Sequence, residues 1–340
     1  MLLIIAHHYV VNSGLTEMFD LSNISCNMVF LQLAGAWGKT VINCFSIITG
    51  YFMVNSKITF KKFTKILLQV EFYYVLFYIL FLVLGYAEFS IKESIRTLLW
   101  FVYEPGNLYV GTYVLFYLFI PFLNVLVENI NKKKFQKLLI LLLTYFCVFS
   151  TFLKNETFDF LCWMAVCYMI GAYIRCYSEK KWDNYRLGML GTILSITLAI
   201  SSVLAIDFVG SHFGINSYYW FVADSNKLLA LTTAMFSFIM FKNMNLRFNR
   251  SINMISSTTF GILLFHANGW PMRNFLWKSV FRNIDLYDSI FLPIHTVLSV
   301  LIVFCVGAFI EFIRIKYIEK IYLPRVYKSK WFLTLEKKFN

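Results

Sequence analysis

Apolar runs recur along the whole chain and alternate with short polar stretches. A helix needs about 20 mostly apolar residues to cross the roughly 30 Å hydrocarbon core of a bilayer. The pattern therefore predicts an all-α, polytopic transmembrane helix bundle of about ten helices, the first of them truncated. After an apolar stretch at 1–11, the predicted segments are 35–55, 64–84, 108–127, 138–153, 160–176, 187–206, 228–241, 256–270 and 288–313.

Two kinds of segment are too short to cross a bilayer unaided. The segments 228–241 and 256–270 need flanking residues or local bilayer thinning. Met1–Val11 has neither a basic region nor a small-residue cleavage site, which argues against a signal peptide. We interpret Met1–Val11 as the second half of a helix.

The composition supports a membrane protein and excludes an ordinary soluble one. Of 340 residues, 59% are hydrophobic, 19% aromatic and 14% charged, against about 25% charged in typical soluble domains. No composition shift divides the chain, so we expect a single integral-membrane domain over 1–340, ending in a basic tail from about 314. The cysteines show no CxxC spacing, so neither a metal site nor a disulfide framework is predicted.

The net charge of +13 would suggest a nucleic-acid partner in a soluble protein, but loop topology explains it here. Most of the 31 Lys and Arg residues cluster in alternate loops, and cytoplasmic loops are the basic ones. The prediction is a multi-pass plasma-membrane protein with a cytoplasmic C-terminus, the lipid bilayer as its partner, and no nucleic acid. The basic stretches lie at 57–65, 132–137, 175–186, 242–250 and 314–338, and the longer outer loops at 12–34, 85–107, 207–226 and 271–287.

All five histidines fall on or near the predicted outer half of the bundle. His7 and His8 lie close to the outer end of the first helix, and the others are His212, His266 and His295. Ionisable groups inside a membrane are costly and point to function, and histidine suits proton transfer near neutral pH. The alternative is that each histidine is an interfacial or interhelical hydrogen-bonding group.

One carboxyl group lies deeper in the predicted bundle. Glu71 and Gln69 occupy the cytoplasmic half of the segment 64–84. Glu71 either contacts a ligand or, as we favour, pairs with a neighbouring lysine such as Lys65. Walker A, GxGxxG, GxSxG and HExxH patterns are absent, which argues against nucleotide-hydrolysing chemistry.

Several stretches, in order along nearly the whole chain, resemble the integral-membrane acyltransferase 3 family. Leu2–Tyr9 and Gly38–Met53 are similar to the opening of that family. Further similar stretches are Trp100–Phe101 with Tyr113–Asn124, then Tyr168–Ile174, and Thr259–His266.

The resemblance implies ten transmembrane helices and an acyl-CoA donor on the cytosolic side. It also implies transfer of an acyl group, usually acetyl, to a hydroxyl of a cell-surface or lipid-linked glycan. The family's main motif is an arginine followed by ten residues and a histidine. His8 takes the histidine position, with His7 as the adjacent alternative, and the arginine would precede Met1. We therefore expect a start upstream of Met1; the alternative is an inactive copy without the first half-helix.

The predicted roles follow from this resemblance. His8, or His7, is the general base on the acceptor hydroxyl or a transient acyl carrier. The residues predicted to bind substrate are His266, Trp100, Tyr113 and Tyr51. No bound cofactor or metal is expected, and acetyl-CoA or another acyl-CoA is the donor substrate. The rival function is a polytopic transporter or polymerase of glycans or lipid-linked oligosaccharides, and the oligomeric state stays open.

Overall fold

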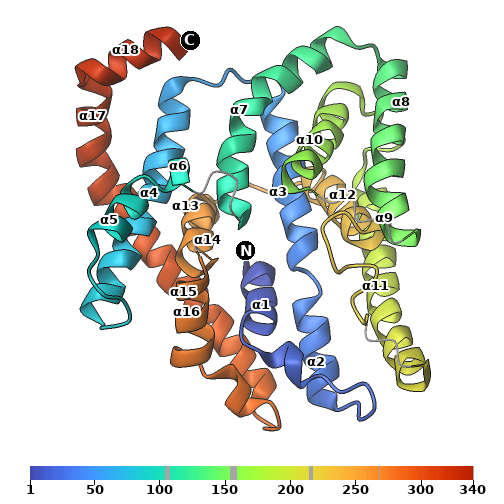
Figure 1. Ribbon diagram of the computed structural model, residues 1–340. Helices are drawn as coiled ribbons and strands as arrows, with labels where there is room; N and C mark the ends of the chain where they lie inside the picture. Colours follow the sequence, from blue (N-terminus) through green and yellow to red (C-terminus); the bar gives the residue numbers. More distant parts are fainter. Residues whose placement is uncertain (104–107, 154–158, 214–216, 268, 340) are drawn as a thin grey trace. The chain divides into compact units, whose positions relative to one another are not determined.

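The computed structural model describes residues 1–103, 108–153, 159–213, 217–267 and 269–339. All regular structure in these ranges is helical (Figure 1), which confirms the predicted all-α class. The chain folds into two compact units. The first unit consists of Met1–Ser56, Phe122–Phe248 and Asn274–Leu301, and the second of Lys57–Pro121, Asn249–Arg273 and Ile302–Asn340.

The first unit holds α1 to α3, α8 to α12 and the turns before the last long helix. Their bounds are α1 Leu2–Val11, η1 Leu15–Met18, α2 Cys26–Gly35, α3 Gly38–Met53, α8 Lys132–Leu143, η2 Thr144–Val148, α9 Phe149–Phe152, α10 Phe160–Tyr177, α11 Tyr185–Phe213, α12 Leu228–Lys242, η3 Phe275–Val280 and η4 Asn283–Leu286.

The second unit holds α4 to α6, α13 to α15 and the C-terminal helices. Their bounds are α4 Phe60–Val83, α5 Ile91–Leu98, α6 Trp100–Tyr103, α13 Arg250–Ser257, α14 Thr259–Ala267, α15 Trp270–Asn274, η5 Arg314–Glu319, α17 Lys320–Lys328 and α18 Lys330–Phe339. Two long helices, α7 Leu108–Asn129 and α16 Leu292–Ile313, contribute residues to both units.

Six helical stretches in the described ranges are long and apolar enough to cross a membrane: Phe60–Val83, Tyr109–Asn129, Lys132–Phe152, Phe160–Tyr177, Tyr185–Gly210 and Leu292–Lys328. Leu2–Val11 and Leu228–Lys242 are shorter apolar helices. All eight overlap predicted segments. Of the two other predicted segments, 35–55 forms the 16-residue α3, and 256–270 is interrupted at Thr258 between α13 and α14.

The core of the first unit is the contact of α3 with α10, which α12 also joins. Ile47, Trp163, Cys167 and Phe238 belong to its cluster of buried side chains. Backbones approach closely where both helices carry glycine. A Cβ at Gly50 would lie 2.1 Å from the carbonyl oxygen of Tyr168, and one at Gly171 would lie 2.1 Å from that of Ile47. Small residues of this kind let membrane helices pack tightly.

The segment before α12 is non-helical yet buried, so its polar groups need partners inside the unit. Ser225 and Asn226 are fully buried. Asn43 of α3 donates to the Ser225 carbonyl at 2.6 Å and accepts from Nε1 of Trp163 at 2.8 Å. Asn226 donates to the carbonyl of Phe146 at 2.8 Å. These side-chain hydrogen bonds hold the segment against α3 and α8–α9.

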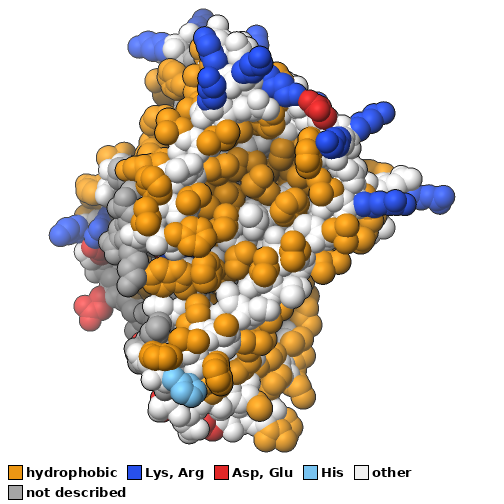
Figure 2. Space-filling model, turned by 90° about the vertical axis from the view of Figure 1, so that its right-hand side faces the viewer, with side chains coloured by type: hydrophobic (Ala, Val, Ile, Leu, Met, Phe, Trp, Pro, Cys, Tyr) orange, Lys and Arg blue, Asp and Glu red, His pale blue; other side chains and the backbone are white. Residues whose placement is uncertain are grey.

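A π-helical turn, η2, joins α8 to α9 into one continuous helix. After the turn, Ser150 and Thr151 are buried, and Oγ1 of Thr151 accepts from the backbone N–H of Leu228 at 3.1 Å. Before it, Ile140 and Leu141 are exposed. Figure 2 shows a broad hydrophobic surface on this side of the molecule, with Lys and Arg side chains gathered beyond one end of it.

In the second unit, the segment after α4 forms two short helices, α5 and α6, that contact α4. Tyr78 of α4 is 3.1 Å from Ser94 of α5, between the hydroxyl oxygens. The rings of Tyr74 and Trp100 are stacked, 5.2 Å between centroids and 4° apart in plane. The predicted outer loop over 85–107 thus contains the helices α5 and α6, its side of the membrane stays a prediction, and 104–107 lie outside the described residues.

Candidate active site

The adjacent histidines of α1 lie where α1 meets α2 and α3. Nδ1 of His7 is 2.6 Å from the carbonyl oxygen of Gly35, at the end of α2. A carbonyl oxygen only accepts, so Nδ1 donates, and Nε2 of the neutral ring keeps its lone pair. This contact fixes the tautomer in which Nε2 of His7 can act as a base.

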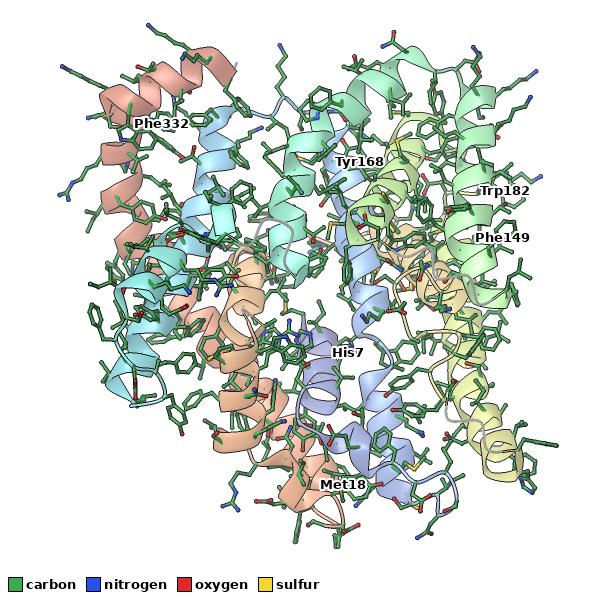
Figure 3. The ribbon with its side chains drawn as sticks, viewed as in Figure 1. His7, Met18, Phe149, Tyr168, Trp182 and Phe332 are labelled. Carbon is green, nitrogen blue, oxygen red and sulfur yellow. The ribbon has the colours of Figure 1, made fainter. Side chains whose placement is uncertain are left out.

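The first residue of α3 has to be small for this arrangement. A Cβ at Gly38 would lie 2.3 Å from Cγ of His7. The rings of His7 and His8 are 5.7 Å apart between centroids and tilted by 47°. Both rings are half-buried, and Figure 3 shows the position of His7 on α1. The structure thus places the two predicted histidines at one three-helix junction.

Tyr9, which follows His8 in α1, provides a hydrogen-bonding partner for His295. The Tyr9 hydroxyl is 2.8 Å from Nδ1 of His295, and Nε2 of His295 is 3.4 Å from the Ser299 hydroxyl. Asn283 donates to the Tyr9 carbonyl at 3.0 Å. Both ring nitrogens of His295 therefore have neighbours within the protein, which fits a structural hydrogen-bonding group.

Three of the residues predicted to bind substrate lie in the second unit. His266 of α14 is fully buried, and its Nδ1 donates to the Ile262 carbonyl at 2.6 Å. Trp100 is buried against Tyr74. The ring of Tyr113 in α7 lies 5.9 Å from that of Phe260. The structure places each of these side chains in a packed aromatic or apolar setting.

Tyr51 lies in the first unit but far along α3 from the histidines. At 1.5 Å per residue, it is about 20 Å along the helix from Gly38, which contacts His7. Arg175 donates to the Tyr51 hydroxyl at 3.2 Å and lies 5.0 Å from the ring centroid. Tyr51 therefore belongs to the end of α3 near the basic stretches 175–186 and 242–250, and the structure does not bring it to His7.

Sequence reasoning missed a buried ion network in the second unit. Glu311, Arg314 and Glu319 are all buried. Glu311 accepts from Nε and an Nη of Arg314, each at 2.8 Å, and Arg314 also pairs with Glu319 at 2.8 Å. Gln69 and Tyr73 of α4 donate to Glu311 at 2.8 and 2.9 Å. The network thus ties α16 and η5 to α4.

This network also corrects the predicted pairing of Lys65. Nζ of Lys65 is 2.6 Å from Glu319, so the expected pair with Glu71 is wrong. Glu319 lies in the stretch after 313 that was predicted as a tail, which here continues as helix. The available sequence signal was the i,i+3 spacing of Glu311 and Arg314 at the end of a long apolar run.

A second missed group lies between α2 and α11. Gln32 donates its amide N–H to Oδ1 of Asp207 at 2.9 Å, and both residues are buried. Oδ2 of Asp207 and Oε1 of Gln32 have no hydrogen-bond partner among the described residues. A proton on the carboxyl group would let it donate to the amide oxygen and satisfy both atoms.

No three or more His, Cys, Asp or Glu residues in the described ranges are grouped so that they could hold a metal ion. The apolar helices, with polar groups paired between them, define a polytopic helical membrane protein.

A family model described as an acyltransferase domain matches residues 1–312. The chain therefore belongs to the acyltransferase 3 family and is a membrane acyltransferase. Comparisons with curated proteins and with solved structures found no match.

Proposed function

We propose that this protein transfers an acyl group, most simply acetyl, from acyl-CoA to a hydroxyl of a cell-surface or lipid-linked glycan. The observation that carries the proposal is the His7–His8 pair, held at the junction of α1, α2 and α3 within the matched range. His8 has the position of the family's motif histidine, and we propose it as the base.

The reaction needs one group that takes a proton and returns it. The acceptor oxygen attacks the thioester carbonyl, a C–O bond forms and the C–S bond breaks. A histidine accepts the hydroxyl proton and passes it to the departing CoA thiolate, so the ring ends neutral. General-base help of this kind contributes about 10² to 10⁴ in rate.

His7 supports this role through geometry, because donation from Nδ1 to the Gly35 carbonyl places the lone pair of the neutral ring on Nε2, the atom that a base uses. It is the alternative base if His8 only binds. Binding roles for His266, Trp100, Tyr113 and Tyr51 belong to the same proposal, and each is tested by its own substitution. The gathering of Lys and Arg at one end (Figure 2) supports a cytoplasmic donor side.

The test supplies membranes with acetyl-CoA labelled in the acetyl group and measures alkali-labile label in surface glycan. We expect labelling that His8→Ala lowers about 10²-fold or more and that His212→Ala, on an exposed side chain, leaves unchanged. The assay includes the 340-residue chain and any chain encoded from an in-frame start upstream of Met1. A second arm deletes the gene. If the glycan itself disappears while its remaining O-acyl content by NMR is unchanged, the proposal fails in favour of a transporter or polymerase.

A further inference from the structure

The first unit contains a cavity of 360 Å³ between α8, α10, the connection after α10, and α12. Ligand pockets typically measure about 300 to 1,000 Å³. The cavity extends along α8 from Lys132 to Leu143, about 16 Å at 1.5 Å per residue. It does not include the histidines of α1, so it is separate from the candidate active site.

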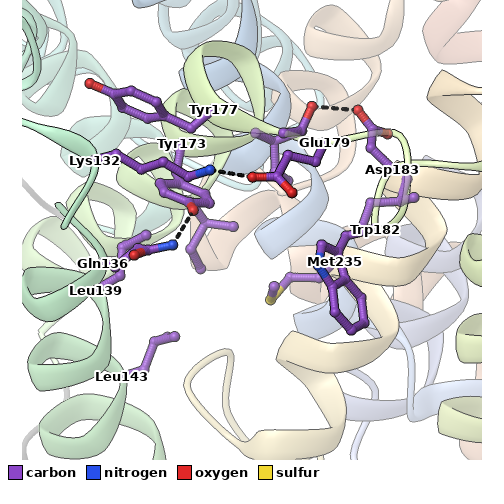
Figure 4. A pocket seen from close by; sticks show the side chains of 14 residues that line it. Lys132, Gln136, Leu139, Leu143, Tyr173, Tyr177, Glu179, Trp182, Asp183 and Met235 are labelled. Atoms are coloured by element: carbon purple, nitrogen blue, oxygen red, sulfur yellow. Dashed lines mark hydrogen bonds and ion pairs between the residues drawn. The ribbon is translucent and has the colours of Figure 1, made fainter.

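The two ends of the cavity differ in chemistry. Figure 4 shows Leu139 and Leu143 at one end and Tyr177, Glu179 and Asp183 at the other. The wall between them is mainly apolar, formed by Ile170, Ile174, Met235 and Ile239, with one polar pair in which Gln136 donates to the Tyr173 hydroxyl at 2.8 Å. An apolar trough with a polar mouth matches an amphiphile with its chain inside and its headgroup at the mouth.

The mouth has features of a membrane interface. Trp182 is 60% exposed, and Nζ of Lys181 lies 4.9 Å from its ring centroid. Amphipathic aromatic side chains and lysines gather at the headgroup level of bilayers. The mouth belongs to the basic stretches 132–137 and 175–186, which are predicted to be cytoplasmic, so a lipid of that leaflet can enter it.

The charges at the mouth select the headgroup. Asp183 is already engaged by Lys242, Asn243 and Ser178. Burial opposes its ionisation, but these hydrogen bonds outweigh burial and lower the pKa of its carboxyl group. Lys132 pairs with Glu179, and their side chains are 39% and 60% exposed. Exposed pairs of this kind are weak, so each partner can exchange the other for a ligand group.

We propose that this cavity binds one membrane phospholipid with a zwitterionic headgroup of the phosphate–amine type. One acyl chain lies between α8, α10 and α12, the phosphate contacts Lys132, and the amine contacts Glu179. A phosphoglycerol headgroup would satisfy Lys132 but offer Glu179 only neutral hydroxyl groups, so the carboxylate would lose its cationic partner. This lipid is neither the acyl donor nor the acceptor. The inference is therefore independent of the proposed reaction.

The test reconstitutes the protein in nanodiscs with equal phosphatidylethanolamine and phosphatidylglycerol, extracts it in mild detergent, and counts retained lipid by native mass spectrometry. We expect one retained phosphatidylethanolamine, favoured about threefold or more over phosphatidylglycerol. Leu143→Trp fills the apolar end and should lower retention about tenfold. Leu141→Trp, two residues away on the same helix but 66% exposed and not lining the cavity, should retain the lipid.

The double substitution Lys132→Gln with Glu179→Gln should keep the lipid but remove the headgroup preference. If Leu143→Trp does not fold, Met235→Trp fills the cavity from α12 and repeats the test. If the Leu143→Trp and Leu141→Trp variants retain equal amounts of lipid, the cavity is not the lipid-binding site. A wild-type preference for phosphatidylglycerol overturns the assigned headgroup, and stoichiometric displacement by palmitoyl-CoA assigns the cavity to the acyl donor instead.

Discussion

The pairing of Gln32 with Asp207 leaves one oxygen of each side chain without a hydrogen-bond partner among the described residues, which makes a sharp stability test possible. Asp207→Asn supplies the missing N–H, so both amides can bond reciprocally, and we expect unchanged or higher stability. Asp207→Leu strands the Gln32 amide and should cost about 1–3 kcal/mol. Melting temperatures in detergent compare the two variants; equal values would show that the pair does not contribute.

Substitutions of the histidines should differ in whether they lower the transfer rate or the stability of the fold. His8→Ala should leave stability nearly intact and remove about 10² or more of the transfer rate. His266→Ala should be next in severity for the rate. His295→Ala should leave the rate per folded molecule near normal but cost about 1–3 kcal/mol, because the Tyr9 hydroxyl loses its hydrogen bond to His295.

Transfer assays and melting curves on the same preparations give this ranking. Full activity in His8→Ala with loss in His7→Ala would move the role by one residue. Full activity in both would end the proposed mechanism.

Sequence reasoning could single out His7 and His8 as candidates because adjacent ionisable residues in an apolar stretch are visible without a fold, and their catalytic role stays a prediction. It could not find the contact of Gln69 with Glu311, or of Gln32 with Asp207, because the partners come from helices far apart in the sequence. Lys65 was paired wrongly for the same reason: Glu71 is close in sequence, but Glu319 is close in space.

Among the helices, the contact of α3 with α10 should tolerate substitution least. In Gly171→Ala the new Cβ meets the Ile47 carbonyl and the Tyr51 backbone nitrogen, which cannot rotate away as a side chain can. We expect a loss of about 2–3 kcal/mol or more, at the upper end for overpacked cores. Cys176→Ala, at an exposed position of the same helix, should stay within about 0.5 kcal/mol.

Thermal unfolding of the two variants, prepared alike, makes this comparison. If the Gly171→Ala protein is as stable as the Cys176→Ala protein, α3 and α10 can move apart without loss of stability.

The apolar runs in the sequence predicted most of the long helices, because the length and apolarity of a segment decide whether it spans a bilayer. They missed the return of α5 and α6 along α4. Ile91, Ile95 and Leu98 recur at helical spacing in α5, but the segment is only eight residues long, too short to be recognised by the length and apolarity that mark a membrane span. The return depends on contacts such as Trp100 on Tyr74, which join residues 26 positions apart.

For the complete chain, the distribution of Lys and Arg predicts its orientation. Reporters fused at the C-terminus and inserted in the loops near Lys61 and Lys133 should be cytoplasmic. A reporter after Ser217, an exposed residue, should be outside. Protection from an impermeant reagent on intact cells measures this, and equal labelling of the C-terminal and Ser217 reporters would refute the orientation.

The π-helical turn at Thr144–Val148 marks a place where the chain can gain or lose one residue during evolution. Each i→i+5 ring holds one residue more than an α-helical turn, so the helix from Lys132 to Phe152 stores a surplus residue within it. Deleting one residue there restores α-helical geometry without lengthening or shortening the connections at either end. Single-residue insertions and deletions in this family should therefore accumulate at this turn rather than in the α-helical stretches that flank it.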